Sequence, residues 1–147
     1  MTKTLVAYFS ASNVTKNLAK NLAKVVEGDT FEIIPEIPYT ESDLNWMDRN
    51  SRSSIEMADK NSRPKIKEKL SNMEDYDTVF IGFPIWWYVA PTIVNTYLES
   101  YDFAGKKIVV FAYSPVCVYC YYCVHTYLLK LLLEYPVPAH QLHNPLQ

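Results

Sequence analysis

Four short segments that are mostly apolar, separated by longer polar or amphipathic segments, constrain the fold of this chain more than any other feature. Such runs are typical of strands buried on both faces of a sheet. The predicted strands are residues 5–9, 30–34, 78–83 and 107–112, and the predicted helices are residues 15–26, a short helix that begins at Pro64, and residues 91–98. This alternation indicates an α/β protein of three layers, with helices on both faces of a parallel sheet of at least four strands.

Helix 15–26 is predicted from apolar residues at helical spacing, which are expected to form its buried face. These residues are Leu18, Leu22, Val25 and Val26. Gly28 is predicted to be the residue that ends the helix.

Residues 36–64 form a long polar stretch without a clear hydrophobic period. Its only large apolar pair near the middle is Trp46 and Met47. Long insertions of this kind are more often functional or mobile than idle, so residues 41–63 are a hypothetical lid.

The chain has 147 residues, 49% of them hydrophobic, which favours one domain over residues 1–147. A net charge of −2 gives no reason to expect nucleic acid or an anionic membrane surface as a partner. The sequence shows no cationic leader before an apolar segment, and its three cysteines are clustered. These features predict a cytoplasmic protein.

A polar turn, Ser10-Ala-Ser-Asn-Val-Thr15, connects the first predicted strand to the first predicted helix. Ligands of open parallel sheets bind outside the carboxyl ends of the strands, and a helix N-terminus there suits a phosphate. The hydroxyls of Ser10, Ser12 and Thr15 would add uncharged donors. The alternative is an ordinary helix cap with incidental serines.

Three large aromatic residues follow the third predicted strand, in Pro84-Ile-Trp-Trp-Tyr88. Aromatic side chains at a strand's carboxyl end are suited to a flat heterocycle. The alternative is that one or two of them are core residues.

Both motifs resemble those of the flavodoxin family, over about residues 3–113. The segment Lys3–Thr15 is similar to the family's first strand and phosphate loop, and Asp77–Pro91 is similar to the second flavin loop of its short branch. The resemblance implies a doubly wound sheet of strand order 2-1-3-4, with a fifth strand doubtful.

The resemblance also implies a noncovalently bound FMN. The backbone of Asn13 and Val14, together with the hydroxyls of Ser10, Ser12 and Thr15, would hold its phosphate. The flavin loop would be Pro84, Ile85, Trp86, Trp87 and Tyr88, with Ser114 in a third loop. Asn13 stands where the family usually has glycine, and asparagine is the next most tolerant residue of positive φ. No catalytic acid or base is implied, because the flavin carries the redox chemistry.

The tail, residues 115–147, departs from the family, because bulky residues and Pro115 replace the expected glycine-rich loop. Only Lys130 and Glu134 are charged there. Either the tail has diverged or the reading frame changes near residue 113. Sequencing the source gene across codons 105–125 distinguishes the two. Without a fifth strand, the fourth would be an exposed edge that favours dimerisation.

Three cysteines in the tail, Cys117, Cys120 and Cys123, raise the question of a metal site beside His125. A cubane cluster requires a fourth cysteine, and the histidine spacing is not one that zinc sites use. We therefore expect incidental thiols and no metal. The nearly apolar run 116–133 is better explained by a helix that covers the sheet than by a membrane span.

The predicted function is that of an FMN-binding electron carrier or a small flavin-dependent oxidoreductase. The expected partner is a redox protein or NAD(P)H. The alternative is a non-catalytic scaffold whose FMN binding is impaired by loss of the third loop and fifth strand.

Overall fold

The computed structural model describes residues 3–114, and the predictions made for residues 115–147 lie outside it. The strands are β1 (Thr4–Tyr8), β2 (Asp29–Glu32), β3 (Thr78–Pro84) and β4 (Lys107–Tyr113). The helices are α1 (Val14–Val25), α2 (Arg52–Ala58) and α3 (Thr92–Glu99), with a 3-10 turn at Met73–Asp75.

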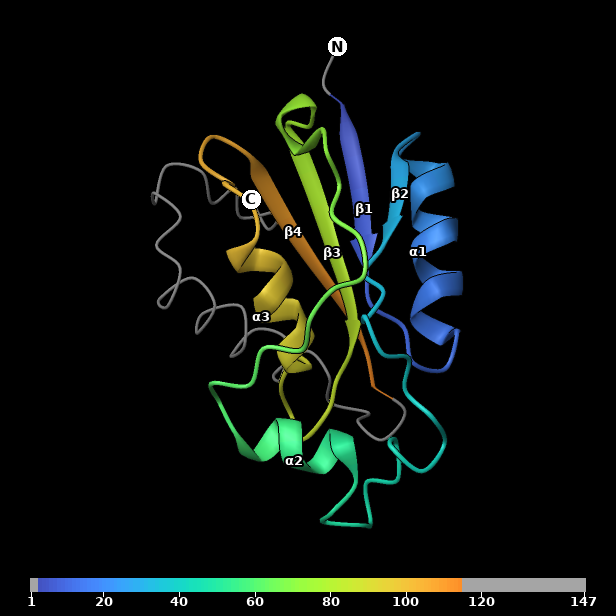
Figure 1. The fold of residues 1–147 in the computed structure, drawn as a ribbon. Coiled ribbons are helices and arrows are strands. Elements are labelled where there is room, and N and C mark those ends of the chain that lie inside the picture. The colour runs from blue at the N-terminus through green and yellow to red at the C-terminus, as the bar shows by residue number, and fades with distance from the viewer. Residues whose placement is uncertain (1–2, 115–147) are drawn as a thin grey trace.

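The described strands form one parallel sheet in the order β2-β1-β3-β4, which confirms the predicted order (Figure 1). In the register of the central pair, Thr4 lies opposite Thr78 and Tyr8 opposite Gly82. Gly82 has no side chain because the Phe111 ring of β4 occupies the space that a β-carbon would need. A chain that crosses from β1 to β2 and from β3 to β4 through helices folds as the alternation of the sequence requires.

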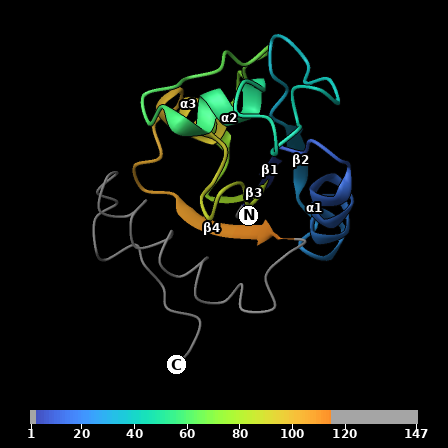
Figure 2. The ribbon, with the colours of Figure 1, turned by 90° about the horizontal axis from the view of Figure 1, so that it is seen from below.

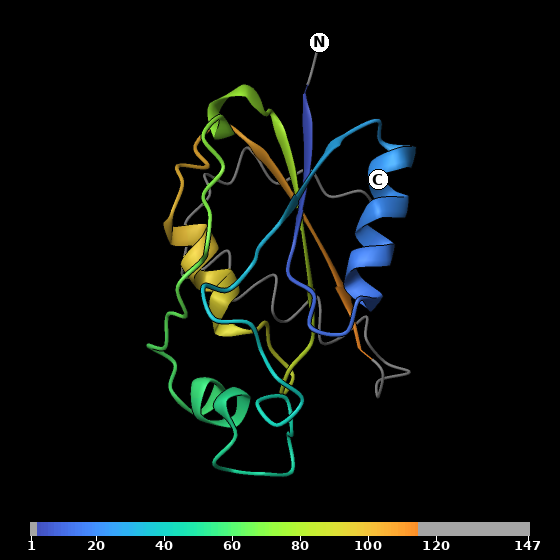
Figure 3. The same ribbon diagram turned by 45° about the vertical axis from the view of Figure 1, so that its right-hand side comes forward.

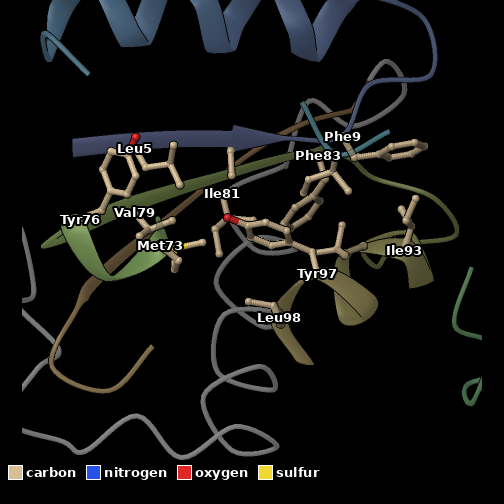
Figure 4. Close-up of a cluster of buried hydrophobic side chains, with 14 residues drawn as sticks. Leu5, Phe9, Met73, Tyr76, Val79, Ile81, Phe83, Ile93, Tyr97 and Leu98 are labelled. Atoms are coloured by element: carbon tan, nitrogen blue, oxygen red, sulfur yellow. The ribbon is translucent and has the colours of Figure 1, made fainter. Parts of the chain in front are cut away.

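Helices cover the sheet on opposite faces, as the view along the strands shows (Figure 2). The α1 face packs Ala19 and Ala23 against Val6 and Tyr8. The α3 face holds the larger core, in which Ile93, Tyr97 and Leu98 point toward the strands (Figure 4). The sheet therefore lies between two helical layers, with one apolar cluster on each of its faces.

Helix α1 buries a different face from the one predicted. Its buried residues are Thr15, Ala19 and Ala23, whereas Leu18 and Val25 are exposed. Small side chains let the helix approach the sheet closely, and only Leu22 and Val26 of the predicted face pack against it. Gly28 is also not the residue that reverses the chain. That position is Glu27, with φ 50°, and the Gly28 amide donates to Ala23 O.

The short helix predicted from Pro64 is wrong. Residues there run extended, because the Glu36 amide donates to Lys65 O and the Lys67 amide donates to Ile34 O, both at 2.8 Å. These bonds to the chain that follows β2 would be lost in a helix. The polar stretch instead contains α2, whose N-cap Ser51 accepts a hydrogen bond from the Ser54 amide.

Candidate functional site

The connections that leave the carboxyl ends of β1 and β3, the two central strands, run in opposite directions along the sheet. The connection from β1 leads through α1 to β2 on one side, and the connection from β3 leads through α3 to β4 on the other. Ligands of open α/β sheets bind at such a topological switch point. The stretch that contains α2 lies at the same end of the sheet (Figure 3). The predicted loops 10–15 and 84–88 follow these two adjacent strands, at the edge of the sheet where this rule places a ligand.

The loop at residues 10–15 has a backbone suited to an anion. Asn13, which precedes α1, has φ 63° and so adopts the left-handed conformation expected of it. The free amides of the first helical turn lie beside it. Ser10 Oγ accepts from the Lys16 amide at 3.2 Å, so Ser10 caps the helix and still has its own hydroxyl proton to donate. Ser12, Asn13 and Val14 are exposed, whereas Thr15 is buried.

A small polar network supports this loop from the side of β2. Lys16 Nζ lies 2.7 Å from Glu32 Oε2, and the Tyr8 hydroxyl donates to the same oxygen at 3.3 Å. Burial, with the Glu32 charge beside it, raises the pKa of Tyr8 to about 12. The tyrosine therefore stays neutral across the physiological range. Glu32 offsets the positive charge of Lys16, which leaves uncharged backbone amides and hydroxyls as the main donors of the loop.

The loop after β3 is a tight hairpin with an unusual backbone. The Trp86 and Val89 amides each donate to the other residue's carbonyl oxygen, at 2.9 and 3.0 Å. The two residues between them, Trp87 and Tyr88, have φ 46° and φ 69°. A two-residue turn with both φ values positive normally uses asparagine and glycine. Two bulky aromatic residues here store strain of about 1–2 kcal/mol each, and strain of this kind clusters at functional sites.

The hairpin is anchored at its base and exposed at its tip. The Ile85 amide donates to Tyr113 O at 2.8 Å, which joins the hairpin to the end of β4 beside Ser114. Pro84, the last residue of β3, and Trp86 are half-buried, whereas Trp87 and Tyr88 are 43% and 79% exposed. The fold thus leaves the Tyr88 side chain largely exposed, and the Trp87 side chain partly exposed, at the switch point.

Replacing Tyr88 by glycine should raise the free energy of unfolding of the ligand-free protein by about 0.5–1 kcal/mol. Relief of about 1–2 kcal/mol of left-handed strain exceeds the 0.5–1 kcal/mol that glycine loses in conformational entropy. Chemical denaturation measures the difference. Tyr88→Ala is the matched control, since it removes the same ring but keeps the β-carbon. Equal stability of the two variants would contradict the strain argument.

Two residues of this site, Phe9 and Tyr39, were not among the predicted site residues. Phe9, at the end of β1, and Tyr39 lie edge-on to the Trp86 ring, with centroids 5.6 Å from it in both cases. Phe9 and Tyr39 also meet each other at 5.9 Å. Phe9 could have been noticed as the last apolar residue of its strand, but Tyr39 lies in a stretch without a period.

A family and several solved structures match this chain. The family model described as Flavodoxin matches residues 3–121, so the chain belongs to the flavodoxin family. Two proteins named as flavoproteins, from Bacteroides uniformis and Bacteroides eggerthii, are 47% and 44% identical to it. Their structures superpose with TM-scores of 0.85 and 0.86, over 92% of this chain in both cases and 83% and 82% of theirs.

More distant structures share the fold. A flavoprotein in complex with FMN from Lactobacillus acidophilus is 20% identical, with a TM-score of 0.68 over 88% of this chain and 85% of the other. No curated protein matches the chain.

Some predictions concern features that the described part of the chain does not contain. The cysteines and His125 lie outside it, and within residues 3–114 no group of three or more histidine, cysteine or acidic side chains is arranged to hold a metal ion. Within the same residues, no helix is both long and apolar enough to cross a bilayer.

Proposed function

We propose that this protein binds FMN noncovalently at the β1/β3 switch point and acts in electron transfer or as a small flavin-dependent oxidoreductase. The observation that carries the proposal is that an uncharged phosphate-type loop and an aromatic hairpin follow the adjacent parallel strands β1 and β3 at the same edge of the sheet. Flavodoxins are the established example of FMN at this switch point. The FMN complex of the distant Lactobacillus flavoprotein is consistent with the proposal.

The residues present fit the parts of FMN. The first turn of α1 offers backbone amides to the phosphate, and the loop before it offers the hydroxyls of Ser10 and Ser12. Trp87 and Tyr88 offer exposed aromatic faces for the isoalloxazine ring. When bound, the flavin supplies the redox chemistry. The protein's part is to hold the ring, exclude water from one side of it and place backbone groups at its edge.

Titration of the purified, metal-free protein with FMN, followed by quenching of flavin fluorescence, tests the proposal. We expect one-to-one quenching. Riboflavin, which lacks the phosphate, should bind much more weakly if loop 10–15 is the phosphate site. A folded protein that quenches neither flavin would be a flavodoxin-like scaffold without flavin function.

The same complex distinguishes the two roles. If NADH or NADPH bleaches the bound flavin under anaerobic conditions, the protein is a reductase. If only a chemical reductant or a reduced redox protein does so, it is a carrier.

Replacing Trp46 by alanine should weaken FMN binding several-fold if the 41–63 segment covers the flavin. Trp46 is 72% exposed in the ligand-free protein, so its removal should change stability by less than about 0.5 kcal/mol. Val25→Ala is the control, because Val25 is 82% exposed at the opposite end of α1 from the phosphate loop. Unchanged FMN affinity in the Trp46 variant would remove the lid hypothesis.

A further inference from the structure

Tyr39 joins the polar stretch 36–64 to the base of the aromatic hairpin. The Tyr39 ring makes edge-on contacts with the Phe9 and Trp86 rings. The Arg52 guanidinium lies over the same ring, 4.2 Å from its centroid. A single side chain therefore contacts the end of β1, the first residue of the hairpin and helix α2.

The hydroxyl end of Tyr39 is held as firmly as the ring. It donates to Glu56 Oε2, and Glu56 Oε1 accepts from Arg52 Nε at 2.7 Å. Arg52 Nη1 donates to Ile37 O at 2.8 Å, which closes the network back onto the chain just before Tyr39. The side chains of Arg52 and Glu56 are only 25% and 13% exposed. Charge-assisted bonds in so sheltered a place are stronger than those of a surface ion pair.

Burial, the hydrogen bond to Glu56 and the Glu56 charge hold the pKa of Tyr39 well above its usual value. The phenol therefore remains a donor to Glu56 at any physiological pH.

We propose that Tyr39, held by Glu56 and Arg52, is a positioning residue of the site. Its ring packs against Trp86 and thereby stabilises the strained backbone conformation of Trp87 and Tyr88, which is the conformation that binds the ligand. A strained turn persists only where its surroundings over-determine it. The hydrogen bonds of Ile85, Trp86 and Val89 fix the backbone of the hairpin, and Tyr39 and Phe9 fix the ring at its base. The effect on flavin rests on the proposed function, whereas the effect on the hairpin does not.

The experiment compares Tyr39→Phe with Tyr76→Phe. Both changes remove one tyrosine hydroxyl that donates to a carboxylate, since Tyr76 OH donates to Asp29 Oδ2 at 2.8 Å. Tyr76 lies at the other end of β1 from Phe9 (Figure 4), so it is a matched control remote from the site. The readouts are amide hydrogen exchange at Ile85, Trp86 and Val89 in the ligand-free protein, and the FMN dissociation constant.

Tyr39→Phe should speed exchange at these amides and raise the FMN dissociation constant, each by about tenfold, as expected for a lost hydrogen bond to a charged acceptor. Tyr76→Phe should change neither by more than about twofold, although both variants lose thermal stability. Tyr39→Leu, which also removes the ring from Trp86, should have the larger effect on both readouts.

Exchange in Tyr39→Phe that matches the wild type would overturn the proposal, as would faster exchange with unchanged FMN affinity in a protein that binds FMN. If the wild type binds no flavin but the exchange results hold, Tyr39 still positions the hairpin and only the proposed function fails.

Discussion

A Ser12→Glu variant should lose FMN binding by a factor of about 100 or more while remaining folded. Ser12 is exposed in the loop that precedes α1, beside the amides proposed to hold the phosphate. Two like charges about 4 Å apart repel by about 4 kcal/mol at an effective dielectric constant of 20. Fluorescence titration with FMN measures the loss.

The apoprotein of this variant should be slightly more stable than the wild type. The first turn of α1 contains no acidic residue, and a carboxylate near a helix N-terminus stabilises it by about 0.3–1 kcal/mol. Loss of binding therefore could not be attributed to unfolding. Ser12→Gln is the control for side-chain size, and it should bind FMN far better than the glutamate variant. Equal binding by the two variants would place the phosphate elsewhere.

The second large effect is expected at Phe9. Phe9 is 1% exposed and supports both Tyr39 and Trp86, so Phe9→Ala should lower the free energy of unfolding by about 3–5 kcal/mol. That is a large share of the total stability of a small domain. Thermal and chemical denaturation measure the loss.

Phe9→Leu separates packing from the aromatic contacts. It nearly conserves volume and should cost less than about 1.5 kcal/mol. It removes the edge-on ring contact with Trp86, so the free energy of FMN binding should weaken by more than the free energy of unfolding decreases. If the alanine variant were as stable as the leucine variant, Phe9 would not carry the packing at the end of β1 that we assign to it.

Much of the frame could be predicted from local patterns. The four strands appear within one or two residues of their predicted bounds. The two central strands, β1 and β3, are the buried ones, and burial on both faces of a parallel sheet requires apolar runs. The left-handed backbone at Asn13 was also predictable, since few other residues tolerate it. The two segments that resemble the family's phosphate loop and flavin loop were recognisable because each consists of residues that are contiguous in the chain.

Residues 36–70 were not predictable in the same way. Extended structure around Ile66 depends on hydrogen bonds to the chain after β2, which lies far from it in sequence. Helix α2 has a clear N-cap in Ser51 but only seven residues, too few to show a reliable period. Two of the four residues predicted for the buried face of α1, Leu18 and Val25, are exposed. The helix instead packs on the sheet through Ala19 and Ala23, whose small side chains allow a closer approach than leucine would.

By itself, the sequence determined the strands, their order along the chain and the two loops that follow β1 and β3, because apolar runs and turn residues are properties of contiguous segments. Only the tertiary structure decided that Trp87 and Tyr88 adopt positive φ and that Tyr39 stands against Trp86. No local preference favours either arrangement. The Ile85 amide bonds to the end of β4, and Phe9 and Tyr39 contact the Trp86 ring, so segments that are distant in the sequence converge on one hairpin. Such convergence arises only when the chain is packed into its tertiary structure.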